Sequence, residues 1–112
     1  MLTAEQNAHL EAARLSCTVG HPQGPYRVIG ELCIWVYAMA YGNGRLCVGH
    51  KDDRTGYDRG FCYQGIDKAF AAADEWDGEG DPPRWFKNLQ THRYRKDGDP
   101  AKEYGPEDRI PE

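Results

Sequence analysis

The residue types needed for nucleophilic catalysis occur near one another at one place in the chain. Cys62 supplies a thiol, His50 a base, and Asp52 an acid that would orient the base. Their spacing matches no known nucleophile motif, and the chain contains no P-loop, no GxGxxG after a strand, no HExxH and no GxSxG. The sequence therefore predicts a protein that is not an enzyme, with no catalytic residues and no cofactor.

Metal binding is the second chemistry to consider. The cysteines are spread about one per expected element: Cys17, Cys33, Cys47 and Cys62. They form no C-x2–4-C pair, and nothing in the sequence indicates the oxidising compartment that disulfides need. A site made of Cys47, His50 and Cys62 is a minor alternative. The loop acids Asp52, Asp53 and Asp58 lack the ligand spacing of a calcium loop. We expect buried free thiols and no metal.

Charged residues are segregated along the second half of the chain. Residues 65–82 carry six acids and one base, residues 83–96 five bases and no acid, and residues 97–112 six acids and two bases. We call one set of acids the acidic turn: Asp74, Glu75, Asp77, Glu79 and Asp81. The bases form the basic segment 84–96: Arg84, Lys87, Arg93, Arg95 and Lys96. The basic segment is expected to fold back onto its acidic flanks, or else to meet a phosphate backbone or an acidic partner.

Length and composition limit the number of domains and the class of partner. A chain of 112 residues suffices for one domain with one modest core. The net charge of −4 is too small for a DNA mimic and has the wrong sign for a simple nucleic-acid binder. There is no apolar run of about 18 residues and no basic-then-apolar leader, so we expect a cytoplasmic protein without membrane contact.

The longest apolar stretch, residues 32–50, predicts two antiparallel strands joined at Asn43-Gly44. Asn-Gly between apolar runs is a strong hairpin signal, because both residues of a type I′ turn need positive φ. A two-residue turn at this position would pair Met39 with Val48.

This register also assigns side chains to the two faces of the hairpin, since side chains alternate along a strand. Cys33 and Cys47 would lie on opposite faces and share neither a bond nor a metal. An aromatic face would carry Trp35, Tyr37 and Tyr41. We expect the rest of the fold to cover that face; otherwise it is a binding surface or is closed by a homodimer.

The remaining elements follow from apolar periodicity and turn residues. Thr3 and Gln6 fit a capping box that begins an N-terminal helix over 3–17. Apolar spacings of three and four predict a helix over 66–76, and prolines followed by an apolar cluster predict a second, short helix over 83–92. Strands are expected over three ranges: 26–41 with a bend at Gly30, 45–50, and 61–63.

The predicted fold class is α+β. It consists of an N-terminal helix, a three-stranded antiparallel meander, and one or two C-terminal helices packed on the sheet. These elements form a single domain over residues 1–96. Residues 97–112 form an irregular polar tail, because they contain Asp-Gly, Asp-Pro and Gly-Pro steps without apolar periodicity.

The sequence from residue 76 to 83, continuing through Trp85 to residues 91–104, resembles the C-terminal half of short uncharacterised proteins carried by phages and prophages of proteobacteria. The hairpin, loop, strand and helix order before it is similar as well, so the resemblance covers about residues 45–104. It implies a mobile-element accessory protein and transfers no catalytic residue. Many small acidic phage proteins bind and block a host machine, and anti-CRISPR proteins are the best-known class of these.

We therefore expect a small non-enzymatic phage protein that binds and inhibits a host protein machine, for example as an anti-CRISPR. Its expected contacts are the acidic turn and any exposed part of the aromatic face. The alternative is a nucleic-acid-binding accessory protein that uses the basic segment 84–96. The chain is expected to be a monomer or a homodimer.

Overall fold

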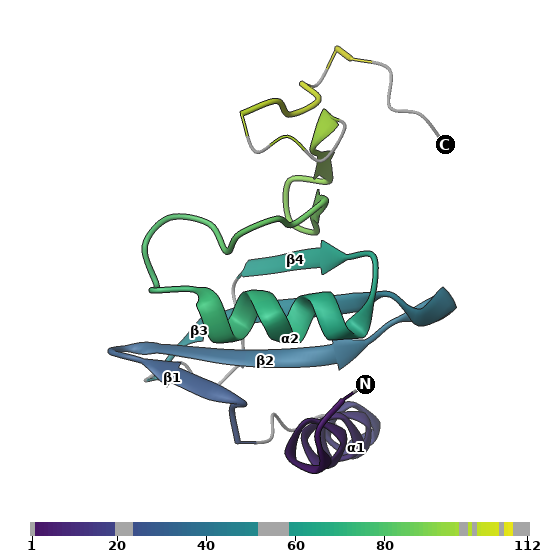
Figure 1. The fold of residues 1–112 in the computed structure, drawn as a ribbon, viewed down its shortest axis with the longest axis vertical. Coiled ribbons are helices and arrows are strands. Elements are labelled where there is room, and N and C mark those ends of the chain that lie inside the picture. The colour runs from purple at the N-terminus through teal and green to yellow at the C-terminus, as the bar shows by residue number, and fades with distance from the viewer. Residues whose placement is uncertain are drawn as a thin grey trace.

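The computed structural model describes residues 2–19, 24–51, 59–96, 99, 101–105 and 107–108, with the backbone alone for 13–19. Within these residues the fold is α+β, with two α-helices and an antiparallel six-stranded sheet in which neighbours in sequence are neighbours in space (Figure 1). The elements are α1 (Ala4–Val19), β1 (Arg27–Ile29), β2 (Leu32–Ala38), a 3₁₀ turn (Ala40–Gly42), β3 (Gly44–His50), β4 (Arg59–Tyr63), α2 (Ile66–Glu75), β5 (Lys87–Asn88) and β6 (Arg93–Tyr94). The α+β class is confirmed. The sheet has six strands, which is three more than the expected meander.

Helix α2 covers one face of the sheet, as its apolar spacing predicted. Its Ala69, Phe70 and Ala73 are buried against the β2–β4 face, where Phe61 and Tyr63 complete the main core. The helix ends where β1 meets it: the Arg27 guanidinium donates to the carbonyls of Ala73, at 2.5 Å, and Trp76, at 2.7 Å. A cation at the last carbonyls of a helix satisfies free acceptors and opposes the negative end of the helix dipole.

The first strand predicted over 26–41 is a hairpin, because the chain reverses at Gly30-Glu31. Gly30 takes φ +58, which a two-residue hairpin turn needs and which costs glycine little. β1 pairs with only the first part of β2, from Leu32 to Ile34. The rest of that edge of β2 is left for another element to cover.

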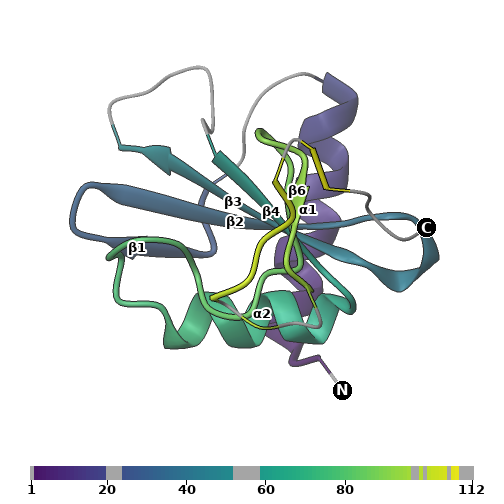
Figure 2. The same ribbon diagram turned by 90° about the horizontal axis from the view of Figure 1, so that it is seen from above.

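Helix α1 covers this edge. The predicted capping box is present: the Gln6 amide donates to Thr3 Oγ1 at 3.1 Å, and the Thr3 amide donates to Gln6 Oε1 at 2.9 Å. Figure 1 shows α1 end-on beyond β2, and Figure 2 shows it crossing the strand direction that α2 follows. Where β1 has ended, the Val36 amide donates to Nε2 of the buried His9 at 3.0 Å. His9 thus supplies the hydrogen-bond acceptor that a neighbouring strand would otherwise provide for the Val36 amide.

His9 makes the docking of α1 dependent on pH. Burial lowers the pKa of His9 below its usual value of 6.5, because the charged form would lose hydration. A protonated Nε2 could also no longer accept the hydrogen bond from the Val36 amide. The unfolded chain therefore binds this proton first as pH falls. The stabilisation from His9 is complete above about pH 6.5 and is lost as pH falls through the folded-state pKa. We expect a loss of about 1–2 kcal/mol, the cost of breaking one buried hydrogen bond.

Urea unfolding measured from pH 8 to pH 5 tests this expectation. His9→Gln keeps an acceptor without a titrating group and should flatten the profile, whereas His50→Gln, at an exposed histidine, should not. A profile that is unchanged in the His9→Gln protein would contradict the assignment.

The β2–β3 connection differs from the predicted turn. Val36 pairs with Leu46 and Ala38 with Gly44, so the loop is residues 39–43 and not Asn43-Gly44. The positive φ values occur two residues earlier than predicted, at Tyr41 (+60) and Gly42 (+75). Asn43 is extended, with φ −73 and ψ 153.

The predicted helix over 83–92 was wrong, because this segment pairs with the open edge of β4. The Phe86 amide donates to the Cys62 carbonyl and the Leu89 amide to the Gly60 carbonyl, at 3.0 and 2.9 Å. Arg84 and His92 take positive φ, which a helix does not accommodate.

The predicted irregular tail over 97–112 is described in part. Its described residues return along β6, where the Tyr104 amide donates to the Tyr94 carbonyl at 2.8 Å and the Lys96 amide to the Lys102 carbonyl at 2.7 Å. This part of the tail therefore extends the β6 edge.

Candidate functional site

The residues considered for catalysis are not assembled into a site. Asp52 lies outside the described residues. Cys62 pairs with Arg45, and His50 lies five residues further along β3, which is about 16 Å in an extended strand. Burial also raises the pKa of the Cys62 thiol, which disfavours the thiolate that a nucleophile needs. The same separation removes Cys47, His50 and Cys62 as a metal site.

The cysteines lie together on the sheet face opposite α2, which corrects the prediction that Cys33 and Cys47 face opposite ways. Cys47 pairs with Trp35, and residues 33 and 35 share a face. The observed register is displaced by an odd number of residues from the predicted one, so the faces of β3 are exchanged relative to β2. Cys33, Cys47 and Cys62 are buried.

Some of the residues considered as metal ligands lie outside the described part of the chain. The side chain of Cys17 and the acids Asp52, Asp53 and Asp58 lie outside the described residues. Across the side chains that are described, no group of three or more histidine, cysteine or acidic residues is placed to hold a metal ion.

The predicted aromatic face is not one surface. Trp35 is 5% exposed and Tyr37 9%, and both pack with Cys33 and Cys47 in a second small core. A single chain therefore covers them without a homodimer partner. Only Tyr41 is presented to solvent, fully exposed at the β2–β3 tip.

The basic segment 84–96 is largely engaged within the protein. Arg84 pairs with Glu75, and Lys96 pairs with Asp108 at 3.3 Å. Lys87 lies over the Tyr94 ring at 5.0 Å, and Arg95 lies over the Trp85 ring at 4.1 Å. The two ion pairs are contacts expected of a segment that folds back onto its acidic flanks. Arg93 is exposed, and so is Arg84 beside Glu75.

The acidic turn is held by hydrogen bonds of its own backbone. The Trp76 indole donates to the Glu79 carbonyl at 3.0 Å, and the Glu79 amide donates to Asp77 Oδ1 at 2.9 Å. Gly78 takes φ +91 and packs on β1, so closely that a Cβ atom there would lie 3.0 Å from Ile29 Cγ2. The turn is therefore fixed to the sheet.

The five acids of this turn differ in their interaction partners. Asp74 accepts a hydrogen bond from the Tyr26 hydroxyl at 2.8 Å. Glu75 forms an ion pair with Arg84, and Asp77 accepts the hydrogen bond that caps the turn. The carboxylates of Glu79 and Asp81 are exposed, and no described side chain pairs with either. The other three acids are exposed as well, so Glu79 and Asp81 differ from them in lacking a partner among the described residues. The acidic turn and the β2–β3 connection, which carries Tyr41, lie at opposite ends of the sheet, so they do not form one surface (Figure 1).

A groove that sequence reasoning missed lies between α2 and the segment after the acidic turn. It has a volume of about 350 Å³ and is lined by Gln64, Lys68, Ala71, Arg84 and Phe86. The three-residue spacing of Lys68 and Ala71 is a signal for a shared helix face, but nothing in the sequence shows that residues 84 and 86 lie opposite them.

No protein-family model matches the chain, and neither a curated protein nor a solved structure is matched to it. Among the described residues, neither helix is long and apolar enough to cross a membrane.

Proposed function

We propose that this protein is a non-enzymatic binding protein that attaches to a basic surface of a host protein machine and blocks it. The observation that carries the proposal is the acidic turn, whose backbone is fixed and whose Glu79 and Asp81 carboxylates face solvent without a partner among the described residues. The phage resemblance described above supplies the host setting, the host cytoplasm, and the inhibitory role.

A fixed turn favours binding for a physical reason. Ordering a loop at an interface costs free energy, and a loop that is already ordered avoids that cost. Two exposed carboxylates on such a turn complement lysine and arginine side chains, and they accelerate encounter with a basic surface. Machines that handle nucleic acid present such surfaces, and CRISPR effectors hold their heteroduplex in a positively charged channel. An inhibitor of the anti-CRISPR kind would compete for a surface of this chemistry.

The nucleic-acid-binding alternative has less support from the geometry. A phosphate-binding surface needs several cations free to replace counterions. Lys96 is paired with Asp108, and Lys87 and Arg95 lie over aromatic rings. Arg93 and Arg84, which shares one nitrogen with Glu75, are too few to form a basic patch along a strand.

Neutralising the outward charge of the acidic turn is expected to weaken partner binding. The tagged protein is used to capture its partner from host lysate with and without nuclease, and mass spectrometry identifies what is bound. For the captured partner, the Glu79→Gln, Asp81→Asn double variant should bind about tenfold more weakly, mostly through slower association at low salt. Stability should be unchanged, because neither side chain supports the fold.

The matched control is Glu103→Gln with Glu107→Gln, which changes the net charge equally at two exposed acids outside the turn. Equal weakening by both double variants would contradict a role for the acidic turn. Partners that disappear with nuclease would contradict protein binding and favour the nucleic-acid alternative.

A further inference from the structure

The groove beside α2 is preformed, because both of its walls are fixed. One wall is the outer face of α2, a regular helix whose inner face is buried in the core. The other is residues 83–86, held by the Tyr63 hydroxyl, which donates to the Pro83 carbonyl at 2.7 Å. The burial of Trp85 and the bond of the Phe86 amide to β4 complete this anchoring. Its volume of about 350 Å³ falls in the range of roughly 300–1,000 Å³ typical of small-molecule sites.

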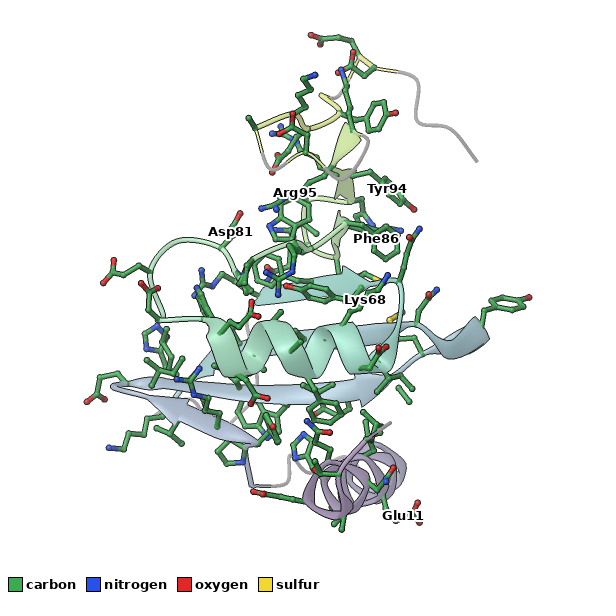
Figure 3. All side chains as sticks on the ribbon, in the orientation of Figure 1. Glu11, Lys68, Asp81, Phe86, Tyr94 and Arg95 are labelled. Carbon is green, nitrogen blue, oxygen red and sulfur yellow. The ribbon has the colours of Figure 1, made fainter. Side chains whose placement is uncertain are left out.

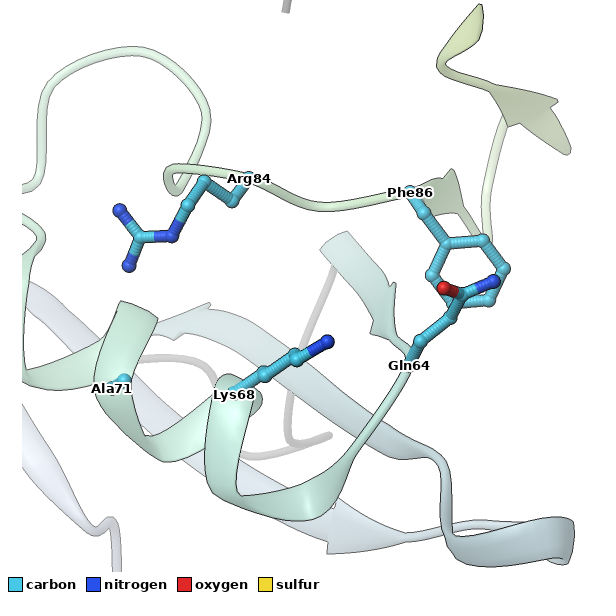
Figure 4. Close-up of a pocket in the computed structure, with 5 residues that line it drawn as sticks. All are labelled: Gln64, Lys68, Ala71, Arg84 and Phe86. Atoms are coloured by element: carbon cyan, nitrogen blue, oxygen red, sulfur yellow. The ribbon is translucent and has the colours of Figure 1, made fainter. Parts of the chain in front are cut away.

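The groove is cationic toward one end. In Figure 4 the Lys68 ammonium points toward Phe86 and Gln64, and Arg84 lies on the other side of Lys68. Among the described residues Lys68 has no ion-pair or hydrogen-bond partner. Glu75 binds one nitrogen of Arg84, which orients the guanidinium and leaves its other donors available. Two cations with one acid at the margin favour an anion.

The other end of the groove is aromatic. Figure 4 shows the Phe86 ring and the Gln64 amide on the far side of Lys68 from Arg84. Phe86 is half-buried and is supported from behind by the Tyr94 ring, with centroids 5.9 Å apart. Figure 3 shows Lys68, Phe86 and Arg95 on the side of α2 that faces the later strands. A supported ring offers a stacking surface, and an amide offers both a donor and an acceptor to a polar ring edge.

We propose that this groove binds a nucleoside monophosphate. The base stacks on Phe86 with its edge toward the Gln64 amide, and the phosphate meets Lys68 and the free donors of Arg84. This site does not depend on the function proposed above, because Glu79 and Asp81 take no part in it. The nucleotide has two possible sources, a free mononucleotide or the 5′-phosphorylated end of a strand, which share this chemistry.

Titration of the isotope-labelled protein with AMP and UMP, followed by NMR, tests the site. Millimolar nucleotide should shift the amide signals of Gln64, Lys68 and Phe86. Inorganic phosphate alone and adenosine alone should each bind at least about tenfold more weakly, because each lacks one of the two contacts. Lys68→Gln should weaken AMP binding about tenfold, the usual loss for a charge-assisted contact. Phe86→Leu should weaken it about fivefold by removing the stacking face.

The matched control is Lys51→Gln, which removes an exposed lysine away from the groove. Equal weakening by Lys51→Gln and Lys68→Gln would overturn the site as general charge attraction. Phosphate that binds as tightly as AMP would overturn the nucleotide assignment, as would signals that do not move with millimolar nucleotide. A 5′-phosphorylated oligonucleotide that binds more tightly than AMP supports the site and identifies strand ends as the source. Equal or weaker oligonucleotide binding supports the site and identifies free nucleotides.

Discussion

Replacing Trp85 with alanine is expected to lower the free energy of unfolding by about 3–5 kcal/mol, the usual cost of removing a large buried ring. Trp85 is 1% exposed and packs on Phe61 of β4, with ring centroids 5.8 Å apart. It is also the surface on which the Arg95 guanidinium lies, at 4.1 Å. The substitution therefore leaves a cavity in the main core and removes the ring on which Arg95, directly after β6, lies. A loss of this size approaches the total stability of many small domains, about 5–15 kcal/mol.

Urea unfolding followed by circular dichroism measures this effect, with Trp85→Phe as the control. The Trp85 indole nitrogen is buried and has no hydrogen-bond partner among the described residues, so phenylalanine loses packing but no hydrogen bond. We expect the phenylalanine protein to lose about 1–2 kcal/mol and to keep a single transition. If Trp85→Ala left the unfolding midpoint unchanged, residues 82–96 would not belong to the cooperative core.

Replacing Gly44 with alanine is expected to cost about 1–3 kcal/mol through overpacking. Gly44 is buried at the start of β3, directly beneath the first turn of α2. A Cβ atom at this position would lie 2.8 Å from Ala69 Cβ, 3.0 Å from Ile66 Cα and 3.1 Å from the Gly65 carbonyl oxygen. Two of these three atoms are backbone, so the whole helix would have to move away from the sheet.

Comparing substitutions of Asn43 and Gly44 distinguishes overpacking beneath α2 from the requirements of a type I′ turn. Asn43 has extended φ and ψ, so Asn43→Ala should change stability by no more than about 0.5 kcal/mol. A type I′ turn would instead require positive φ at Asn43 and would make that substitution costly. Thermal melts of the two single variants decide between them, and a larger loss for Asn43→Ala than for Gly44→Ala would contradict the observed register.

The local sequence was sufficient to predict the elements whose defining interactions join residues close together in the chain. The capping box of Thr3 and Gln6 depends on residues three apart, and it begins α1 as predicted. The apolar spacing of α2 predicted both its extent and its buried face, because a helix closes its own hydrogen bonds and needs only one side to pack. The acidic residues of the turn after α2 were likewise apparent from a short stretch of sequence, but its attachment to β1 was not.

The tertiary structure alone decided the hairpin register. Asn43-Gly44 satisfies a turn motif, but Gly44 is small because α2 packs against it. Packing of the helix outweighed a local preference, and the shift by an odd number of residues moved Leu46 and Val48 onto the α2 face with Ile34. A turn motif does not reveal that a helix more than twenty residues later lies on it.

The second half of the sheet and the groove also depended on tertiary context. Residues 83–92 carry helical signals, but a short, isolated helix is only marginally stable. Pairing with the open edge of β4 instead satisfies backbone groups of both strands. Once β5 pairs there, Arg84 and Phe86 are brought opposite Lys68, although they lie sixteen and eighteen residues away in sequence. The sequence by itself determined the helices and the charged turn, because their interactions lie within a few residues of one another. The tertiary structure decided the strand register, the added strands and the groove, because each depends on which distant backbone groups remain unpaired.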